Sequence, residues 1–111
     1  MSERVKKVNE FIREKVSESL NALIDNPEIG LFTVTDVEST PDLKHADVWI
    51  SFISEDHRRS LELVDTLRRD VQQDLSHTLV MKYVPRIRFR LDESQKHVER
   101  ITELLGKQKN V

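Results

Sequence analysis

The first segment of the chain has apolar residues at intervals of three and four, which is the spacing of one face of an α-helix. This stripe consists of Val5, Val8, Ile12, Val16, Leu20 and Leu23. Ser2 can cap the start of the helix. The sequence Asp25-Asn26-Pro27 favours a turn, because proline disfavours helical geometry in the residue before it. The pattern therefore predicts an amphipathic helix from Ser2 to about Ile24.

Two strands are predicted next, because apolar and polar residues then alternate with a period of two. Residues 31–37 follow Gly30 and are rich in β-branched residues, with Phe32 and Val34 on one face. Residues 46–53 place Ala46, Val48, Ile50 and Phe52 on one face of a second strand. A turn sequence lies between the two segments, at residues 39–42. An antiparallel hairpin is the expected arrangement.

A long helix and a third strand are predicted after the hairpin. The helical pattern opens at Ser54-Glu55-Asp56 and is interrupted by Tyr83-Val84-Pro85. Its stripe consists of Leu61, Val64, Leu67, Val71, Leu75 and Thr78/Leu79. Residues 86–91 then alternate without a break, which is typical of a strand with one buried face.

A final helix is expected after this strand, capped by Asp92-Glu93-Ser94 and ending at Gly106. Its apolar positions are Val98, Ile101, Leu104 and Leu105, and residues 107–111 form a frayed tail. The element order is helix, strand, strand, helix, strand, helix. Residues 1–111 are therefore predicted to form one α+β domain with two layers, in which the helices cover one face of a three-stranded sheet.

Composition narrows the possible chemistry. The 111 residues include no cysteine, which excludes disulfides, a thiol nucleophile and cysteine metal sites, and only two glycines, which excludes a glycine-rich phosphate loop. No nucleophile motif is present, so neither an enzyme nor a cofactor is expected. His45-Ala46-Asp47 with Asp56-His57 is a weak metal-ligand cluster, and no metal site is assigned to it. The absence of a signal peptide or long apolar stretch predicts a soluble cytoplasmic protein.

The segment 82–90 carries a local charge of +4 within a chain of net charge −2. Alternation along the third strand places Arg86, Arg88 and Arg90 on one face, at a repeat of about 6–7 Å, which is comparable to phosphate spacing along a single RNA strand. This basic ladder could contact phosphates. It could equally be a solvated face with cross-strand pairs to Asp47 or Glu38.

Trp49 is predicted to lie on the same face as the arginine ladder. An exposed indole beside guanidinium groups can stack on a nucleic-acid base. The alternative use of this side chain is packing at the edge of the sheet. Paired cations at Lys6/Lys7, Arg58/Arg59 and Arg68/Arg69 are secondary candidates for phosphate contact, although solvated helix faces account for them as well.

Four stretches in fixed order and spacing resemble ribosome-binding factor A, a family of small bacterial assembly factors, over about residues 4–105. These stretches are Ile24–Gly30, Thr33–Ser39, Asp42–Ser51 and Val84–Ser94. The resemblance implies a KH-like fold of the second topological type. It also implies non-catalytic binding to 16S ribosomal RNA on the immature small subunit, late in its maturation and linked to cold adaptation. Release with the help of an assembly GTPase is implied too, and we expect a monomer that does not bind membranes.

The long helix departs from the family pattern. Members usually carry a small-residue kink, Ala-x-Gly, followed by an Ile-Arg pair, whereas this chain has Leu67-Arg68-Arg69 and then Val71-Gln72. Glycine therefore no longer encodes a kink here, although packing could still bend the helix. The loss of the family's arginine at Gln72 removes one charge-assisted contact.

The expected RNA-contacting residues share a positive charge and lie on the long helix, just before the third strand or on it. They are Arg68, Arg69, Lys82, Arg86, Arg88 and Arg90. The alternative function is a protein–protein interaction module of the same fold, in which acidic helix faces bind a partner and the arginines only keep the sheet solvated.

Overall fold

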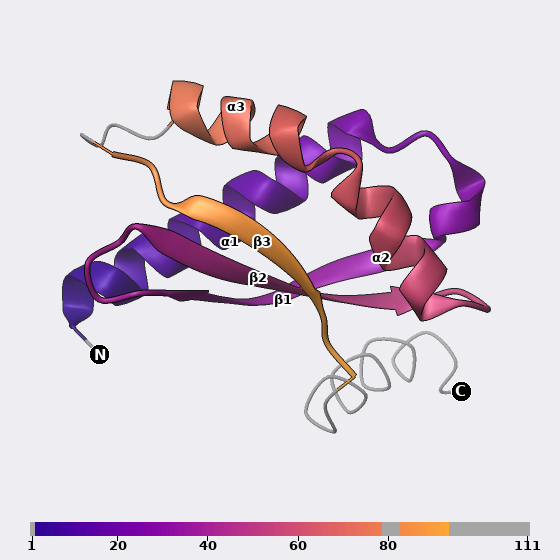
Figure 1. Cartoon of the computed structure of the whole chain (residues 1–111), viewed down its shortest axis with the longest axis horizontal. Coiled ribbons are helices and arrows are strands. Elements are labelled where there is room, and N and C mark those ends of the chain that lie inside the picture. The colour runs from indigo at the N-terminus through magenta and orange to yellow at the C-terminus, as the bar shows by residue number, and fades with distance from the viewer. Residues whose placement is uncertain (1, 79–82, 94–111) are drawn as a thin grey trace, which may run out of the picture.

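The computed structural model describes residues 2–78 and 83–93. Its elements are α1 (Glu3–Leu23), the short 3₁₀ helix η1 (Pro27–Ile29), β1 (Leu31–Ser39), β2 (His45–Ile53), α2 (His57–Asp65), α3 (Arg68–Thr78) and β3 (Arg86–Leu91). The three α-helices lie on one side of a three-stranded sheet, and α3 runs beside α1 (Figure 1). The predicted α+β class is confirmed. The expected final helix and its tail lie outside the described residues.

The sheet is mixed and has the order β1-β2-β3. β1 and β2 form the predicted antiparallel hairpin, whereas β3 pairs in parallel with β2. A parallel neighbour requires a crossover connection, and α2 and α3 provide it on the covered side of the sheet. The parallel register sets Arg86 beside His45, Arg88 beside Asp47 and Arg90 beside Trp49.

A bulge at Thr35 changes which residues of β1 face the helices. Val34 pairs with Ile50, but Asp36 pairs with Trp49, so Thr35 is an extra residue in the ladder. Its hydroxyl donates to the carbonyl oxygen of Trp49 at 2.9 Å. In a regular strand, residues three positions apart point to opposite faces. Because of the bulge, Val34 and Val37 are both buried.

The core lies between the sheet and the helices. Four residues of the α1 stripe are buried, and Val8 and Leu23 are partly buried against the core. The Ser2 hydroxyl caps the helix, as predicted, by accepting from the Val5 amide at 3.1 Å. The completely buried residues of the core are Ile12, Val16, Leu20, Val48, Ile50, Val64 and Val71. No helix within residues 2–78 and 83–93 combines the length and apolar character needed to cross a bilayer.

Two tight connections hold the ends of the hairpin. Gly30 has a φ of 76°, and a Cβ atom there would lie 2.5 Å from the Ile53 carbonyl oxygen, so only glycine fits. At the other end, Asp42 accepts from the Thr40 hydroxyl at 2.7 Å and from the Lys44 amide at 3.1 Å. The hydrogen bond from Thr40, followed by that from Lys44, lowers the pKa of Asp42.

The sequence left open whether the long helix is straight or kinked. The structure shows a break in it, so the uninterrupted helix is wrong and the kinked one is confirmed. α2 ends at Asp65, and α3 begins at Arg68. Between them, the Thr66 hydroxyl donates to the Leu63 carbonyl at 2.6 Å, and the Leu67 amide bonds to Val64 rather than Leu63. A threonine that competes for a carbonyl and a tightened 3₁₀-type turn therefore bend the chain without glycine.

Candidate nucleic-acid interface

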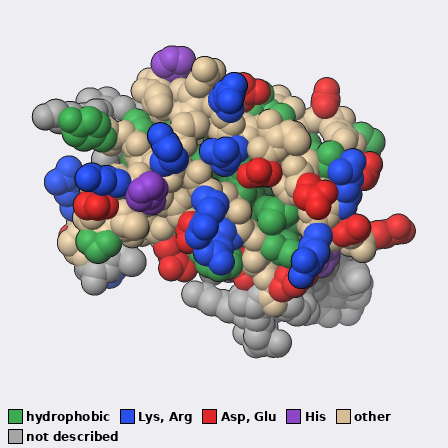
Figure 2. Space-filling model, viewed as in Figure 1, with side chains coloured by type: hydrophobic (Ala, Val, Ile, Leu, Met, Phe, Trp, Pro, Cys, Tyr) green, Lys and Arg blue, Asp and Glu red, His purple; other side chains and the backbone are tan. Residues whose placement is uncertain are grey.

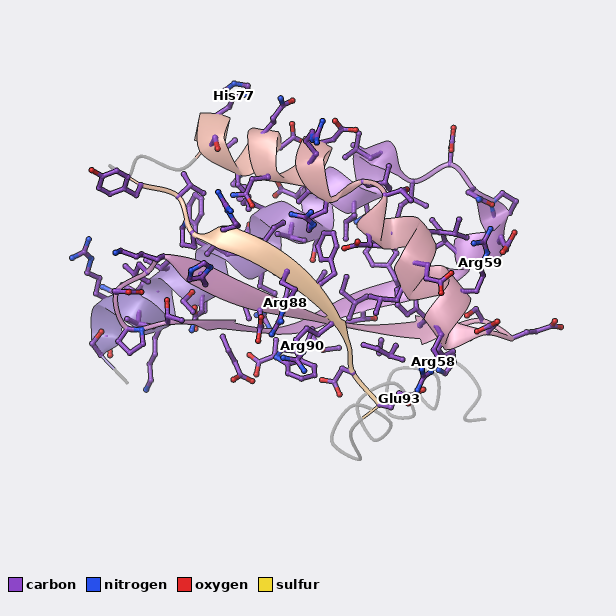
Figure 3. All side chains as sticks on the ribbon, viewed as in Figure 1. Arg58, Arg59, His77, Arg88, Arg90 and Glu93 are labelled. Carbon is purple, nitrogen blue, oxygen red and sulfur yellow. The ribbon has the colours of Figure 1, made fainter. Side chains whose placement is uncertain are left out.

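The two faces of β3 differ completely in exposure. Ile87 and Phe89 are buried against the helices, whereas Arg86, Arg88 and Arg90 are exposed on the opposite face. We call this the open face, because α1, α2 and α3 do not cover it. Figure 3 shows Arg88 and Arg90 extending from the same side of the strand. The predicted basic ladder is therefore present, because period-two alternation holds along the whole strand.

The ladder is partly neutralised by Asp47 of the neighbouring strand. Arg88 donates to the Asp47 carboxylate through Nε at 3.1 Å and NH2 at 3.4 Å, and Arg90 NH1 lies 3.3 Å from Asp47 Oδ2. The parallel register, which aligns Asp47 with Arg88, creates this three-residue cluster. Cross-strand pairing with Asp47 is thus confirmed, whereas Glu38 pairs with none of the arginines among the described residues.

Trp49 lies beside this cluster, as predicted. The Arg90 guanidinium lies over its ring, 4.8 Å from the ring centroid, which is a cation–π geometry. The indole is half-buried, and its Nε1 atom has no hydrogen-bond acceptor among the described residues. In this structure the indole face beside Arg90 is covered by a guanidinium, so base stacking on that face would require Arg90 to move.

A groove of about 630 Å³ connects the arginine ladder to the junction of α2 and α3. Its lining residues are Glu38, Thr40, His45, Ala46, Asp47, Asp65, Arg68, Arg86, Ile87 and Arg88. Arg68 is the first residue of α3, and its Nε lies 3.6 Å from Asp65 Oδ1. The helix break therefore places Arg68 in the same groove as Arg86 and Arg88, although the chain separates them by 18 and 20 positions.

The charge of the groove is mixed. Three arginines line it, and so do three carboxylates, those of Glu38, Asp47 and Asp65. Figure 2 shows the same character over the visible face, where basic and acidic side chains are interspersed. Arg86 is the groove arginine that forms no ion pair with a described residue. It therefore has the most accessible charge for an anionic ligand.

The other predicted cations are not gathered in the groove. Arg69 is exposed on α3 outside it, and Lys82 lies outside the described residues. Arg59 is bound to Glu28 through Nε at 2.9 Å, and this hydrogen bond raises the pKa of Arg59. Arg58 and Arg59 lie on α2, at the far end of β3 from the groove, as Figure 3 shows.

The two histidines of the weak metal-ligand cluster have different neighbours in the structure. His45 lines the groove, whereas His57 Nδ1 lies 3.3 Å from Glu93 Oε1 at the start of α2. Within the described ranges no three potential ligands among His, Asp and Glu come together to hold a metal ion.

Gln72 has a role that sequence reasoning missed. Its Nε2 donates to the Pro85 carbonyl at 2.9 Å, and its Oε1 accepts from the Ile87 amide at 2.9 Å. The side chain therefore satisfies two backbone groups at the start of β3, which is an edge strand of the sheet. Gln72 fixes the strand that carries the arginines, instead of supplying a charge in the way an arginine would.

Comparison with known proteins gives a consistent match over nearly the whole chain. The family profile described as "Ribosome-binding factor A" matches residues 4–105. Ribosome-binding factor A of Macrococcus caseolyticus is 32% identical over 108 residues, covering 96% of this chain and 95% of the relative. The chain belongs to the ribosome-binding factor A family. The family protein of Protochlamydia amoebophila is 33% identical over 95% of this chain and 82% of its own length.

Solved structures of ribosome-binding factor A share the fold. The crystal structure of the Thermus thermophilus protein gives a TM-score of 0.71 at 18% identity, covering 78% of this chain and 93% of that one. The solution structure of a Thermotoga maritima protein, described as a putative ribosome binding factor A, gives 0.72 at 21% identity, with coverage of 86% and 93%. A homology model of the Thermus thermophilus factor, fitted into a map of a 30S–RbfA complex, gives 0.64 at 21% identity, with coverage of 74% and 88%.

Proposed function

We propose that this protein is a non-catalytic assembly factor that binds the small ribosomal subunit through its 16S rRNA and assists late maturation and rRNA processing. Family membership is the observation that carries the proposal. It is supported by the Thermus thermophilus factor, a homology model of which is described as fitted into the map of a 30S–RbfA complex. We further propose that the protein works in the cytoplasm as a monomer and that an assembly GTPase assists its release.

The order of elements supports a KH-like fold of the second type. The described chain runs α1, β1, β2, α2, α3, β3, and the bend between α2 and α3 stands beside the edge strand. In this proposal the bend, with Arg68 at its end, takes the place of the glycine loop that contacts RNA in ordinary KH domains. We propose that the bend at Thr66 serves in place of the family's small-residue kink, because the Thr66 hydroxyl donates to the Leu63 carbonyl at this point.

Within the groove, Arg68, Arg86 and Arg88 are the residues we propose to contact the RNA backbone. Guanidinium groups match phosphate oxygens in geometry and charge, and such contacts fix orientation without reading sequence. Arg90, Arg69 and Lys82 are proposed to add contacts beyond the groove. Binding would stabilise one arrangement of the rRNA until remodelling of the subunit displaces the factor.

Cosedimentation with isolated small subunits, large subunits and assembled ribosomes tests this function. We expect the protein to migrate with free small subunits at low salt and to dissociate as salt rises. The double variant Arg68→Gln, Arg86→Gln should weaken binding by about tenfold or more, because two charge-assisted contacts are lost, and should flatten the salt dependence.

The matched control is Arg4→Gln, Arg13→Gln, which makes the same change in net charge at exposed positions of α1. Neither residue lines the groove, so we expect a change of less than about twofold. Equal losses from both double variants would show that net charge, rather than the groove, determines binding. Absence of the protein from every ribosomal fraction would reject the proposed function.

A protein–protein interaction module without direct RNA contact is the second candidate. The observation that favours it is the balanced charge of the groove, in which Asp47 and Asp65 engage Arg88 and Arg68. Treatment of the cellular complex with ribonuclease distinguishes the two functions. Release of the protein by ribonuclease supports RNA binding, whereas retention on a protein partner supports the alternative.

A further inference from the structure

We infer that Asp47 is an internal competitor of RNA phosphate, which occupies Arg88 and Arg90 in the free protein and keeps RNA affinity below what the arginine ladder could provide. The inference rests on the proposed function and deepens it, because it concerns how the same surface is regulated. Asp47 is the single carboxylate that both arginines share among the described residues.

The geometry at Asp47 resembles that of a bound phosphate. Arg88 presents the Nε and NH2 edge of its guanidinium to the two carboxylate oxygens, at 3.1 Å and 3.4 Å. This fork is the arrangement that guanidinium groups use for phosphate as well as for carboxylate. A phosphate that uses the same edge of Arg88 must therefore displace Asp47.

Arg90 is held in a similar way. Its NH1 atom lies 3.3 Å from Asp47 Oδ2 while its guanidinium stacks on Trp49. Stacking restricts the plane of the guanidinium, and the contact with Asp47 occupies one of its edges. Displacement of Asp47 would therefore free a donor on Arg90 as well as the fork on Arg88.

Exposure makes this competition reversible. The side chains of Arg88, Arg90 and Asp47 retain 65%, 43% and 30% of their accessible surface. Ion pairs in contact with water contribute little and are screened by salt, so an incoming phosphate can break them. While Asp47 occupies Arg88 and Arg90, the protein binds isolated RNA weakly and binds well only where several phosphates are presented together. Weak binding of this kind suits a factor that must later leave its site.

Substitution of Asp47→Asn tests the inference, with Glu38→Gln as the matched control. Both variants remove one negative charge from the groove, and Glu38 lies directly opposite Asp47 in the β1–β2 register. Glu38 contacts neither arginine among the described residues, so only Asp47→Asn releases the pair. The probes are a fluorescently labelled single-stranded RNA of about twelve nucleotides and isolated small ribosomal subunits, titrated at several salt concentrations.

For Asp47→Asn we expect RNA affinity to rise by about threefold to tenfold at moderate salt, with a salt dependence steeper by up to about 1.4 units of log–log slope, because as many as two more cations meet single-strand phosphates. Glu38→Gln should raise affinity by less than about twofold. The triple variant Asp47→Asn, Arg88→Gln, Arg90→Gln should lose the gain. A thermal melt of each variant confirms that it is folded, and Asp47→Ala provides a second removal of the carboxylate.

The outcomes separate this inference from the proposed function. If the wild-type protein binds small subunits and both Asp47 variants bind RNA no better than Glu38→Gln, the inference is wrong and the proposed function stands. An equal gain in RNA affinity from Asp47→Asn and Glu38→Gln would also overturn the inference, because the change in net charge alone would then explain the gain. If neither the wild type nor any variant binds RNA or subunits, the proposed function itself fails.

Discussion

The two faces of the sheet are made from the same strands but are stabilised in different ways. On the covered face, Val48, Ile50 and Ile87 are at most 2% exposed and pack against the helices. On the open face, Arg88 pairs with the Asp47 carboxylate in contact with water. Arg90 stacks on the Trp49 ring on the same face. The covered face therefore supplies most of the burial that stabilises the domain, and the open face presents the charged side chains that we propose contact RNA.

The contrast has a simple physical basis. Burial of an apolar side chain requires only that it point inward, and its contribution grows with the area removed from water. A charged pair on the open face requires a particular register, and water weakens whatever it gains. Substitutions on the covered face should accordingly change stability, whereas those on the open face should mainly change binding.

The largest effect is expected from Ile50→Ala in the centre of β2. Ile50 is completely buried in the core, so the substitution should lower the free energy of unfolding by about 2–4 kcal/mol. Urea denaturation followed by circular dichroism measures this change. Ile53→Ala is the matched control, because Ile53 ends the same strand with 44% of its surface exposed and should cost about 1 kcal/mol or less. Similar losses from both variants would contradict the difference between the faces.

An intermediate effect is expected where the covered face meets the edge of β3. Gln72→Ala removes the partners of the Pro85 carbonyl and the Ile87 amide, which lie in buried residues, and should cost about 1–3 kcal/mol. The adjacent Gln73→Ala is the control, since Gln73 is exposed and should change stability by less than about 0.5 kcal/mol. Urea denaturation compares the two variants. An unchanged midpoint for Gln72→Ala would show that water replaces its hydrogen bonds.

Much of this fold could be predicted from the sequence. The hydrophobic stripe of α1, its Ser2 cap and the alternation along β3 depend on local periodicity, and the structure confirms each of them. The break between α2 and α3 was harder to predict, because the apolar stripe continues across it from Val64 to Val71. The signal for the break was Thr66, whose hydroxyl bonds to the Leu63 carbonyl.

The arrangement of the candidate site could be predicted only in part. Alternation placed the three arginines on the open face, but the parallel register that sets Arg88 beside Asp47 depends on a long crossover. The bulge at Thr35 likewise has no clear local signal, since it arises from the pairing of two strands. The role of Gln72 required knowledge of where α3 stands relative to β3, and a single sequence does not contain that information.

The smallest effect is expected from the Arg88–Asp47 pair, which tests the open face by itself. A double-mutant cycle of Arg88→Ala, Asp47→Ala and the combined variant should give a coupling energy for unfolding of about 0.2–1 kcal/mol, because the pair is exposed. The coupling should shrink as salt is raised from about 0.05 to 1 M, since screening weakens exposed pairs. Equilibrium urea unfolding at each salt concentration measures it. A coupling of several kcal/mol that is insensitive to salt would mean that the open face stabilises the fold, and the division of roles between the two faces would then be wrong.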